Sequence, residues 1–397
     1  MAYNLLDNIG WCCINVPPIA GASQITSNVP FPLQIVPGVT SLASATPGGG
    51  RLGIQQDPYT PTVFNFHFEI EQALPGNISL RVGYIGSHEY HEVLRADANT
   101  AFPTICPASP CPAGLPDGTK YFSSPVVRRN PQLGSAGIFF TSAVNSYNGI
   151  FVDVNRRFRN GFALRTNYTY GQSLDNSSAI TGTQAGGQVG VVMDPEDRMR
   201  DYGLSAFDVR NRFSLSGVYE LPIGTGKPFL SGVKGVADKL VSGWQLNAIV
   251  NVQSGFPFTP ILGFNQSRNG DTGLPDRPNW APGRTSDGIY LRTPEHWVDA
   301  TAFALPAAGT YGNVGRNVLT GPGLTDVDMS MFKTTRLTER SSLQFRAEAF
   351  NLLNRSNFGL PNLVMLTPSG APASSAGAIT TTATTSRQIQ LGLKVSW

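Results

Sequence analysis

The chain has 397 residues, enough for two average domains or for one large all-β unit. Charged residues make up 14% of it, whereas about 25% is typical of soluble proteins, and 43 glycines and 30 prolines favour many turns and little helix. The net charge of +3, with no Lys/Arg cluster, gives no indication of a nucleic-acid partner. No apolar run approaches the ~18–20 residues that a membrane-spanning helix needs.

The N-terminus does not resemble a signal peptide. Its first 22 residues contain no Lys or Arg, and Asp7 lies where the basic region of a signal peptide belongs. We therefore expect no signal peptide at this end.

Two hairpins are predicted in the first half of the chain. Segments 64–71 and 78–84 alternate apolar and polar residues around the turn sequence LPGN, and 150–157 and 162–170 do so around Asn160-Gly161. Because successive side chains of a strand point to opposite faces, each segment is predicted to have one apolar and one polar face.

A Pro-rich stretch, CPASPC, lies between these hairpins and contains Cys106 and Cys111. A small disulfide loop there fits an oxidising compartment, and two unpaired thiols are the alternative. The adjacent Cys12 and Cys13 give no indication of either.

Five more strands are predicted in the second half. Segments 212–221 and 244–253 form a third pair, joined by GVKGVADKLVSG, which predicts one or two helical turns. Segments 326–331 and 343–349 form a fourth pair with a turn near Thr338. The C-terminal RQIQLGLKVSW alternates to its last residue and makes the ninth strand.

The connections are unequal in length. Long connections at 86–146, 171–207, 256–324 and 351–385 are polar or rich in Gly and Pro, and we expect 100–130, 176–205 and 262–300 to be surface-exposed. Compact soluble domains rarely contain several structureless loops of that length. Strands of about ten residues, short turns at one end and long loops at the other predict an all-β fold, an antiparallel transmembrane β-barrel of the outer membrane.

A soluble sandwich is the alternative fold, because alternation alone fits both. In a sandwich the apolar face points inward, whereas in a barrel it faces lipid, which cannot satisfy open strand edges. The unequal loops, the strand length and the aromatic residues near strand ends favour the barrel. Those aromatic residues are Tyr84, Tyr168, Tyr170 and Trp244.

Several stretches resemble the C-terminal half of the Oar-like TonB-dependent transporter barrels. They cover most of residues 55–397 in the family's order, and they are more specific jointly than singly. The stretches are ALPGNISLRVGYIGSHEYH, NYTYGQSLDNSSA, FDVRNRFSLSGVYELPIG, GWQLNAIVNVQSGFPFTP, GNVGRNVLTGPGLTDVDMSMFK and LQFRAEAFNLLNRSNFGLPN.

The last strand is also similar to the signal by which the outer-membrane barrel assembly machinery recognises its clients. In that signal, alternating apolar residues end in an aromatic, usually Phe, with Trp as an accepted variant. The matching residues here are Leu391, Leu393, Val395 and Trp397.

The front of the chain departs from the family. Full members carry a signal peptide, a small β-sandwich domain, a TonB-contacting segment, a plug and about 22 strands, and an all-antiparallel barrel closes only on an even number. Residues 1–61 resemble an extracellular loop, and 62–397 resemble the C-terminal strands. We therefore expect a fragment, whose contact with TonB would depend on the missing N-terminal part.

Three stretches carry weak indications of a ligand site. HEYHE (88–92) looks like a metal cluster but is expected at a solvated junction between strand and loop. MDPEDRMRD (193–201) could hold calcium through its carboxylates, although its spacing is not that of an EF-hand loop. GTGKP (224–228) lacks the residues of a phosphate loop and is expected to be a turn. With no base–nucleophile pairing, neither an enzyme nor a cofactor is predicted.

The polar face is the best functional candidate, because it would line a wet lumen. The resemblance implies that its residues contact a plug and a passing solute, and the alternative is that they only pair and hydrate a wall. The candidates are Glu69, Glu71, Arg81, Asp153, Arg157, Arg165, Arg212, Glu220, Arg346 and Glu348.

The resemblance implies an outer-membrane transporter or receptor of a Gram-negative cell that imports a solute using energy delivered through TonB. The solute is not identified by the sequence. A secreted or surface all-β binding or adhesion module is the alternative, and a passive porin is a third.

Overall fold

The computed structural model describes residues 51–397 except positions 132, 180–182, 185–187, 190 and 272. Residues 1–50 lie outside this set. The expectations for a signal peptide, for Cys12 and Cys13, and for most of the segment 1–61 therefore fall on residues that are not described. Among the described residues, no helix has the length and apolar character needed to cross a membrane.

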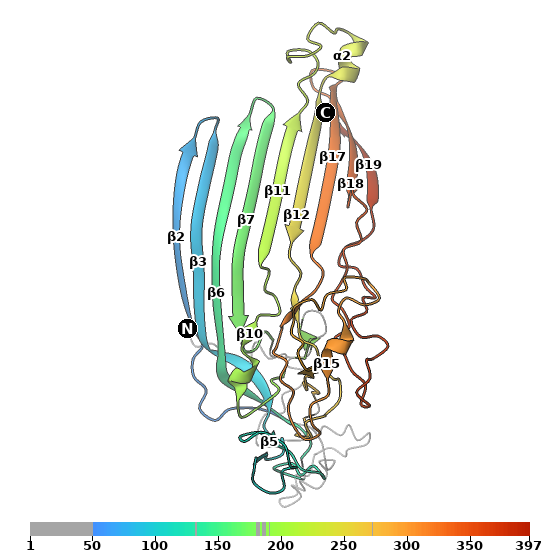
Figure 1. The fold of residues 1–397 in the computed structure, drawn as a ribbon. Coiled ribbons are helices and arrows are strands. Elements are labelled where there is room, and N and C mark those ends of the chain that lie inside the picture. Colours follow the sequence, from blue (N-terminus) through green and yellow to red (C-terminus); the bar gives the residue numbers. More distant parts are fainter. Residues whose placement is uncertain (1–50, 132, 180–182, 185–187, 190, 272) are drawn as a thin grey trace, which may run out of the picture.

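Nine long strands lie in the main sheet in the order in which they occur in the chain, and each is antiparallel to the next (Figure 1). The predicted all-β antiparallel fold is therefore confirmed. The strands are β2 (Thr62–Leu74), β3 (Ile78–Asp97), β6 (Ala136–Arg159), β7 (Phe162–Asp175), β11 (Asn211–Glu220), β12 (Trp244–Gln253), β17 (Leu324–Arg336), β18 (Ser342–Phe350) and β19 (Gln388–Ser396).

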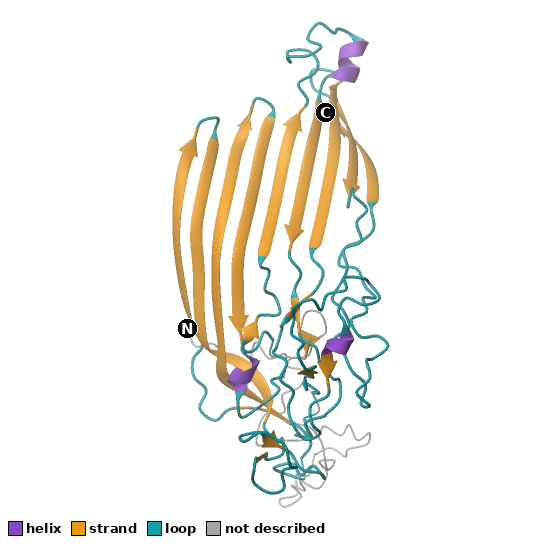
Figure 2. Ribbon diagram, viewed as in Figure 1, coloured by secondary structure: helices purple, strands orange, loops and turns teal. Residues whose placement is uncertain are grey.

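All four hairpin turns lie at one end of the sheet, and the C-terminus lies there too (Figure 2). Asn160 and Gly161 take φ values of 55° and 77°, as the tight turn between β6 and β7 requires. The connection from β11 to β12 contains α2 (Val236–Val241), where the sequence predicts helical turns. We call this end the short-turn end.

Several strands are longer than predicted, and β3 and β6 exceed their predicted spans the most. β3 and β6 stay paired up to Asp97 and Gly137, so much of the expected loop 86–146 is strand. The register shifts near His91, whose φ is 60°, because the pairing passes through a β-bulge. HEYHE therefore lies within β3, and its assignment to a strand–loop junction is wrong.

Small elements fill the opposite end of the molecule. β1 pairs with β6 in parallel and β10 with β7, while the other short strands pair with each other. The bounds are β1 (Arg51–Ile54), β4 (Thr104–Ile105), β5 (Lys120–Tyr121), β8 (Thr183–Gln184), β9 (Gln188–Val189), η2 (Arg198–Asp201), β10 (Gly203–Leu204), β13 (Pro257–Phe258), β14 (Asn279–Trp280), η3 (Ala300–Ala302), β15 (Phe303–Ala304) and β16 (Leu319–Thr320).

The long connections pack against one another and form what we call the loop layer, the described residues of 98–135, 176–210, 254–323 and 351–387. Its hydrophobic core unites two connections that are distant in the chain. This core takes residues from 262–300, so that segment is partly buried within the loop layer, and its expected exposure at the cell surface stays a prediction. Fully buried members of the core are Phe258, Leu262, Ile289, Leu319 and Met365.

Candidate functional site

One face of the main sheet, which we call the apolar face, is formed by the apolar members of the alternating strands. Directly paired residues of neighbouring strands share a face. Where apolar residues are paired with apolar residues from strand to strand, the strands together form one continuous apolar face. One row runs across six strands without a polar residue. It consists of Ile70, Val82, Val152, Tyr168, Phe213 and Val252.

Apart from contacts with α2 at its short-turn end, the apolar face is not covered by the described part of the chain. Phe68 is 67% exposed and Ile70 61%, and at the other edge of the sheet Leu391 is 67% and Leu393 69% exposed. Soluble monomers rarely leave an apolar surface of that extent in water, and a sandwich would bury it. The apolar face therefore has the character of a membrane-facing surface.

The opposite face, which we call the polar face, carries a charge cluster on the first strands. The guanidinium of Arg81 lies 3.9 Å from the Glu69 carboxylate and 3.6 Å from that of Asp153. Asp153 is only 5% exposed and is also 3.8 Å from Arg165. Glu71 is the direct cross-strand partner of Arg81. Five of the ten lumen candidates thus come together.

The other five candidates lie apart from this cluster. Arg212 donates to the Gln253 side chain at 3.4 Å, and Glu220 pairs with Lys227 at 2.9 Å. Arg346 donates to the Gln344 side chain at 2.6 Å. Glu348 is paired in the register with Ser330 and Gln390, and Arg157 lies in the irregular end of β6, beside the turn at Asn77.

An aromatic contact on the polar face was missed by the sequence reasoning. The ring of Tyr147 covers the paired Gly149 and Gly171, where an added Cβ would lie 2.6 Å and 2.7 Å from its hydroxyl oxygen. A side chain at either position would collide with the ring unless the ring moved, so the two glycines leave the space that Tyr147 occupies. Two glycines within otherwise alternating strands were the available signal.

Three of the four carboxylates of MDPEDRMRD are paired with cationic side chains from other connections. Asp194 pairs with Lys120 at 2.7 Å, and the buried Asp201 pairs with the buried Arg277 at 2.8 Å. Glu196 accepts from Arg129. These groups join separate connections of the loop layer, and the described residues contain no group of three His, Cys, Asp or Glu side chains that could hold a metal ion.

The two other stretches take part in local packing. In HEYHE, His91 stacks on Tyr59 with ring centroids 4.8 Å apart, and His88 lies 5.8 Å from the Phe66 ring. GTGKP lies in the connection between β11 and β12 at the short-turn end, where Gly224 has a φ of 103°.

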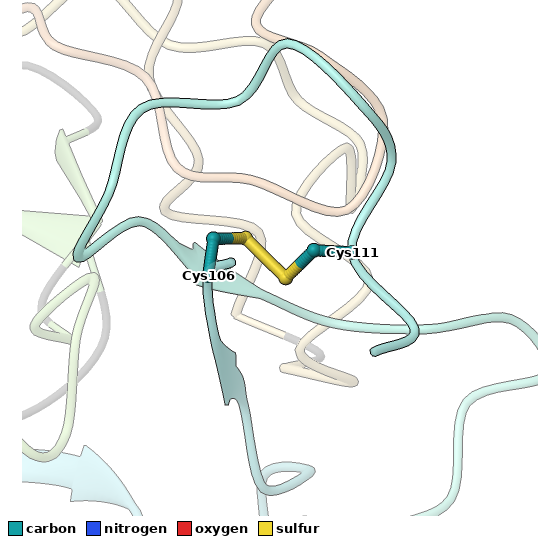
Figure 3. Close-up of a disulfide and its surroundings, with 2 residues drawn as sticks. All are labelled: Cys106 and Cys111. Carbon is teal, nitrogen blue, oxygen red and sulfur yellow. A yellow bond between two sulfur atoms is a disulfide. The ribbon is translucent and has the colours of Figure 1, made fainter. Parts of the chain in front are cut away.

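Cys106 and Cys111 form a disulfide in the loop layer, with Cα atoms 5.7 Å apart (Figure 3). Their loop is closed further by a backbone hydrogen bond from the Cys106 amide to the Thr119 carbonyl, at 3.0 Å. Because a disulfide persists in an oxidising compartment, this placement fits a loop layer outside the cytoplasm.

The C-terminal strand lies at one edge of the sheet and pairs only with β18 among the described strands. Leu391, Leu393 and Val395 lie on the apolar face, and Trp397 is 93% exposed at the short-turn end. β2 forms the other edge, so both edge strands present backbone groups on one side.

Asp271 makes the stability of the loop layer dependent on pH. Burial raises the pKa of this carboxyl to about 7 from an ordinary 3.8, the Asp97 and Asp276 carboxylates add to the rise, and the hydrogen bond from the Gly273 amide opposes it. The folded protein thus favours the protonated form. The stabilisation is complete below about pH 4 and is lost as the pH rises through about 7.

We expect the loop layer around Asp271 to open more readily at pH 8 than at pH 5, by at most about a hundredfold in the opening equilibrium. Hydrogen–deuterium exchange of 263–277, corrected for intrinsic rates, measures this change. Asp271→Asn keeps the acceptor for the Gly273 amide and should remove most of the effect, although Asp276 still titrates. An unchanged pH dependence in that variant would assign it to another group.

An exposed apolar face, a charged opposite face, and turns and loops segregated to opposite ends define a transmembrane β-barrel protein. The chain belongs to the outer membrane beta barrel domain family, whose model matches residues 12–390. The outer-membrane location predicted from the sequence is confirmed by this match.

A search of solved structures finds three transport or receptor proteins, among others, with partial similarity to this chain. The outer membrane transporter YddB from Escherichia coli is 10% identical, with a TM-score of 0.43, over 86% of this chain and 33% of that one. The FrpB iron transporter from Neisseria meningitidis is 8% identical, with a TM-score of 0.37, over 87% of this chain and 33% of that one. FpvA of P. aeruginosa, solved with bound pyoverdine, is 11% identical, with a TM-score of 0.36, over 84% of this chain and 27% of that one.

The chain spans a third or less of the length of these three proteins. A search of curated proteins finds no match.

Proposed function

We propose that this chain forms the C-terminal strands of a TonB-dependent outer-membrane transporter that binds a solute and imports it. The observation that supports this proposal is that one continuous sheet has an exposed apolar face and an opposite polar face. The polar face has a charge cluster at Arg81, Asp153 and Arg165. In this proposal the apolar face contacts lipid and the polar face lines the lumen.

The two open edges of the sheet support a larger assembly. Unpaired backbone groups of a strand edge are not tolerated in hydrocarbon, so β2 and β19 require partners there. In this proposal further strands of the same protein supply them, together with a plug and a segment that contacts TonB. The alternating end of β19 would serve the barrel assembly machinery as its recognition signal.

The orientation can be tested with inserted epitope tags. Outer-membrane barrels have short periplasmic turns and long extracellular loops, so we expect tags at Gly114 or Gly283, where the structure leaves open space, to bind antibody on intact cells. Tags in the turns at Gly76 or Gly226 should bind only after the outer membrane is permeabilised. The reverse pattern would invert the topology.

Solute import is tested by comparing what cells remove from a complex medium. We expect mass spectrometry to find at least one compound that is depleted by wild-type cells, but neither by cells lacking the gene for this protein nor by cells lacking TonB. Depletion that persists without TonB would favour a passive porin. No depletion together with altered surface attachment would favour an adhesion module.

A further inference from the structure

The connection between β11 and β12, residues 221–243, is the longest link at the short-turn end and leaves large apolar side chains uncovered. In α2, Val236 is 76% exposed and Leu240 68%. They are four residues apart and therefore lie on one side of this short helix. Phe229 and Leu230, earlier in the connection, are 62% and 56% exposed. Nothing in the described chain covers these residues.

Hydrogen bonds attach α2 to the apolar face of the sheet. The Trp244 indole Nε1 donates to the Leu240 carbonyl at 3.0 Å, and the Thr335 hydroxyl donates to the Lys239 carbonyl at 3.4 Å. The Lys333 ammonium donates to the Ser242 carbonyl. All three donor side chains belong to the apolar face, because Trp244 pairs with Lys333, Lys333 with Phe345, and Thr335 with Leu343.

The attachment point also has the composition of a membrane–water interface. Trp244 lies beside Lys333, whose ammonium is 5.8 Å from the indole ring centroid. Tryptophan is enriched at that depth, and a lysine among apolar residues reaches towards the polar region with its ammonium. In Figure 1, α2 lies just past the end of the sheet at which β12 begins and β17 ends.

The charges of the connection suit phospholipid headgroups. It contains three lysines, Lys227, Lys234 and Lys239, and one acidic residue, Asp238. Asp238 is engaged by the hydroxyls of Thr225 and Ser242, and Lys227 is paired with Glu220. Lys234 and Lys239 have no ion pair within the described residues. Apolar side chains beside free lysines are typical of segments that lie in a membrane interface.

We propose that residues 229–241 are an interfacial anchor, in which Val236 and Leu240 insert into the periplasmic leaflet of the outer membrane and Lys234 and Lys239 contact anionic phospholipid headgroups. The anchor continues the lipid contact of the apolar face past the strand ends. It rests on the proposed orientation, with the short-turn end in the periplasm. A protein partner on the same residues is the competing occupant.

Photocrosslinking of the full protein in intact outer membranes tests the anchor. Benzoylphenylalanine is placed at Leu240 or Val236, at Ile389 on the apolar face as a positive control, and at Leu291 as a control in the loop layer; Ile389 and Leu291 are 71% and 53% exposed. We expect phospholipid adducts at Leu240 and Val236 in yields comparable to that at Ile389, and none at Leu291.

Charge reversal supplies a second readout. Lys234→Glu together with Lys239→Glu should lower the adduct yield at Leu240 at least about fivefold and leave that at Ile389 unchanged. Protein adducts at Leu240, no adducts there, or an unaffected yield would overturn the anchor. Loss of lipid adducts at Ile389 as well would instead contradict the proposed function.

Discussion

Arg277→Met should destabilise the loop layer by about 3–5 kcal/mol, because it leaves the buried Asp201 carboxylate without its counter-charge. Both side chains of this pair are buried, and the partners come from different connections. The measurement is the urea concentration at which the loop layer of the membrane-embedded protein becomes sensitive to protease.

Two variants control this prediction. Arg284→Met removes a more exposed partner, 2.6 Å from Asp299, and should cost no more than about 1 kcal/mol because exposed pairs contribute little. Arg277→Met combined with Asp201→Asn should recover part of the loss, since no uncompensated charge then remains. Equal effects of Arg277→Met and Arg284→Met would mean that the buried pair does not hold the loop layer together.

Val250→Arg should destabilise the protein in a bilayer by roughly 2–4 kcal/mol, because it places a charge on the apolar face towards the middle of β12. Leu164→Arg places a charge on the same face but close to the short turn that precedes β7, so it should cost less, because the penalty falls towards the membrane interface. Both residues lie in register with apolar or small residues, Leu164 with Gly217 and Val250 with Leu215. Equilibrium unfolding from lipid vesicles measures the loss.

The matched controls lie on the polar face of the same strands. Asn167→Arg and Asn251→Arg should cost little, because Asn167 pairs with Asp153 and Ser214, and Asn251 with Ser214 and Asp326, all on the side assigned to the lumen. If both faces tolerate arginine equally, the apolar face does not contact lipid and the orientation of the strands is wrong.

The sequence by itself predicted nine strands, their antiparallel order and the chemistry of both faces. This information is local, because a strand between two different environments alternates its side chains with a period of two. Asn160-Gly161 shows the same locality, since a two-residue turn encodes its hairpin without any distant contact. The helical turns at Val236–Val241 were readable for a similar reason.

Only the tertiary structure decided which lumen candidates meet. Arg81 contacts Asp153 because of the register between β3 and β6, and a shift of one residue would send every side chain of a strand to the opposite face. The sequence places charges on a face but does not pair them across strands. Arg346 and Glu348 carry the same alternating signal and lie apart from this cluster.

The loop layer was also beyond the reach of sequence patterns. Phe258 and Met365 share one hydrophobic core, and Asp201 finds Arg277, although no periodicity links these positions. Their segments contain Gly, Pro and polar residues that resemble exposed loop. Burial of these residues depends on contacts between separate connections, which the sheet holds together at one end of its strands.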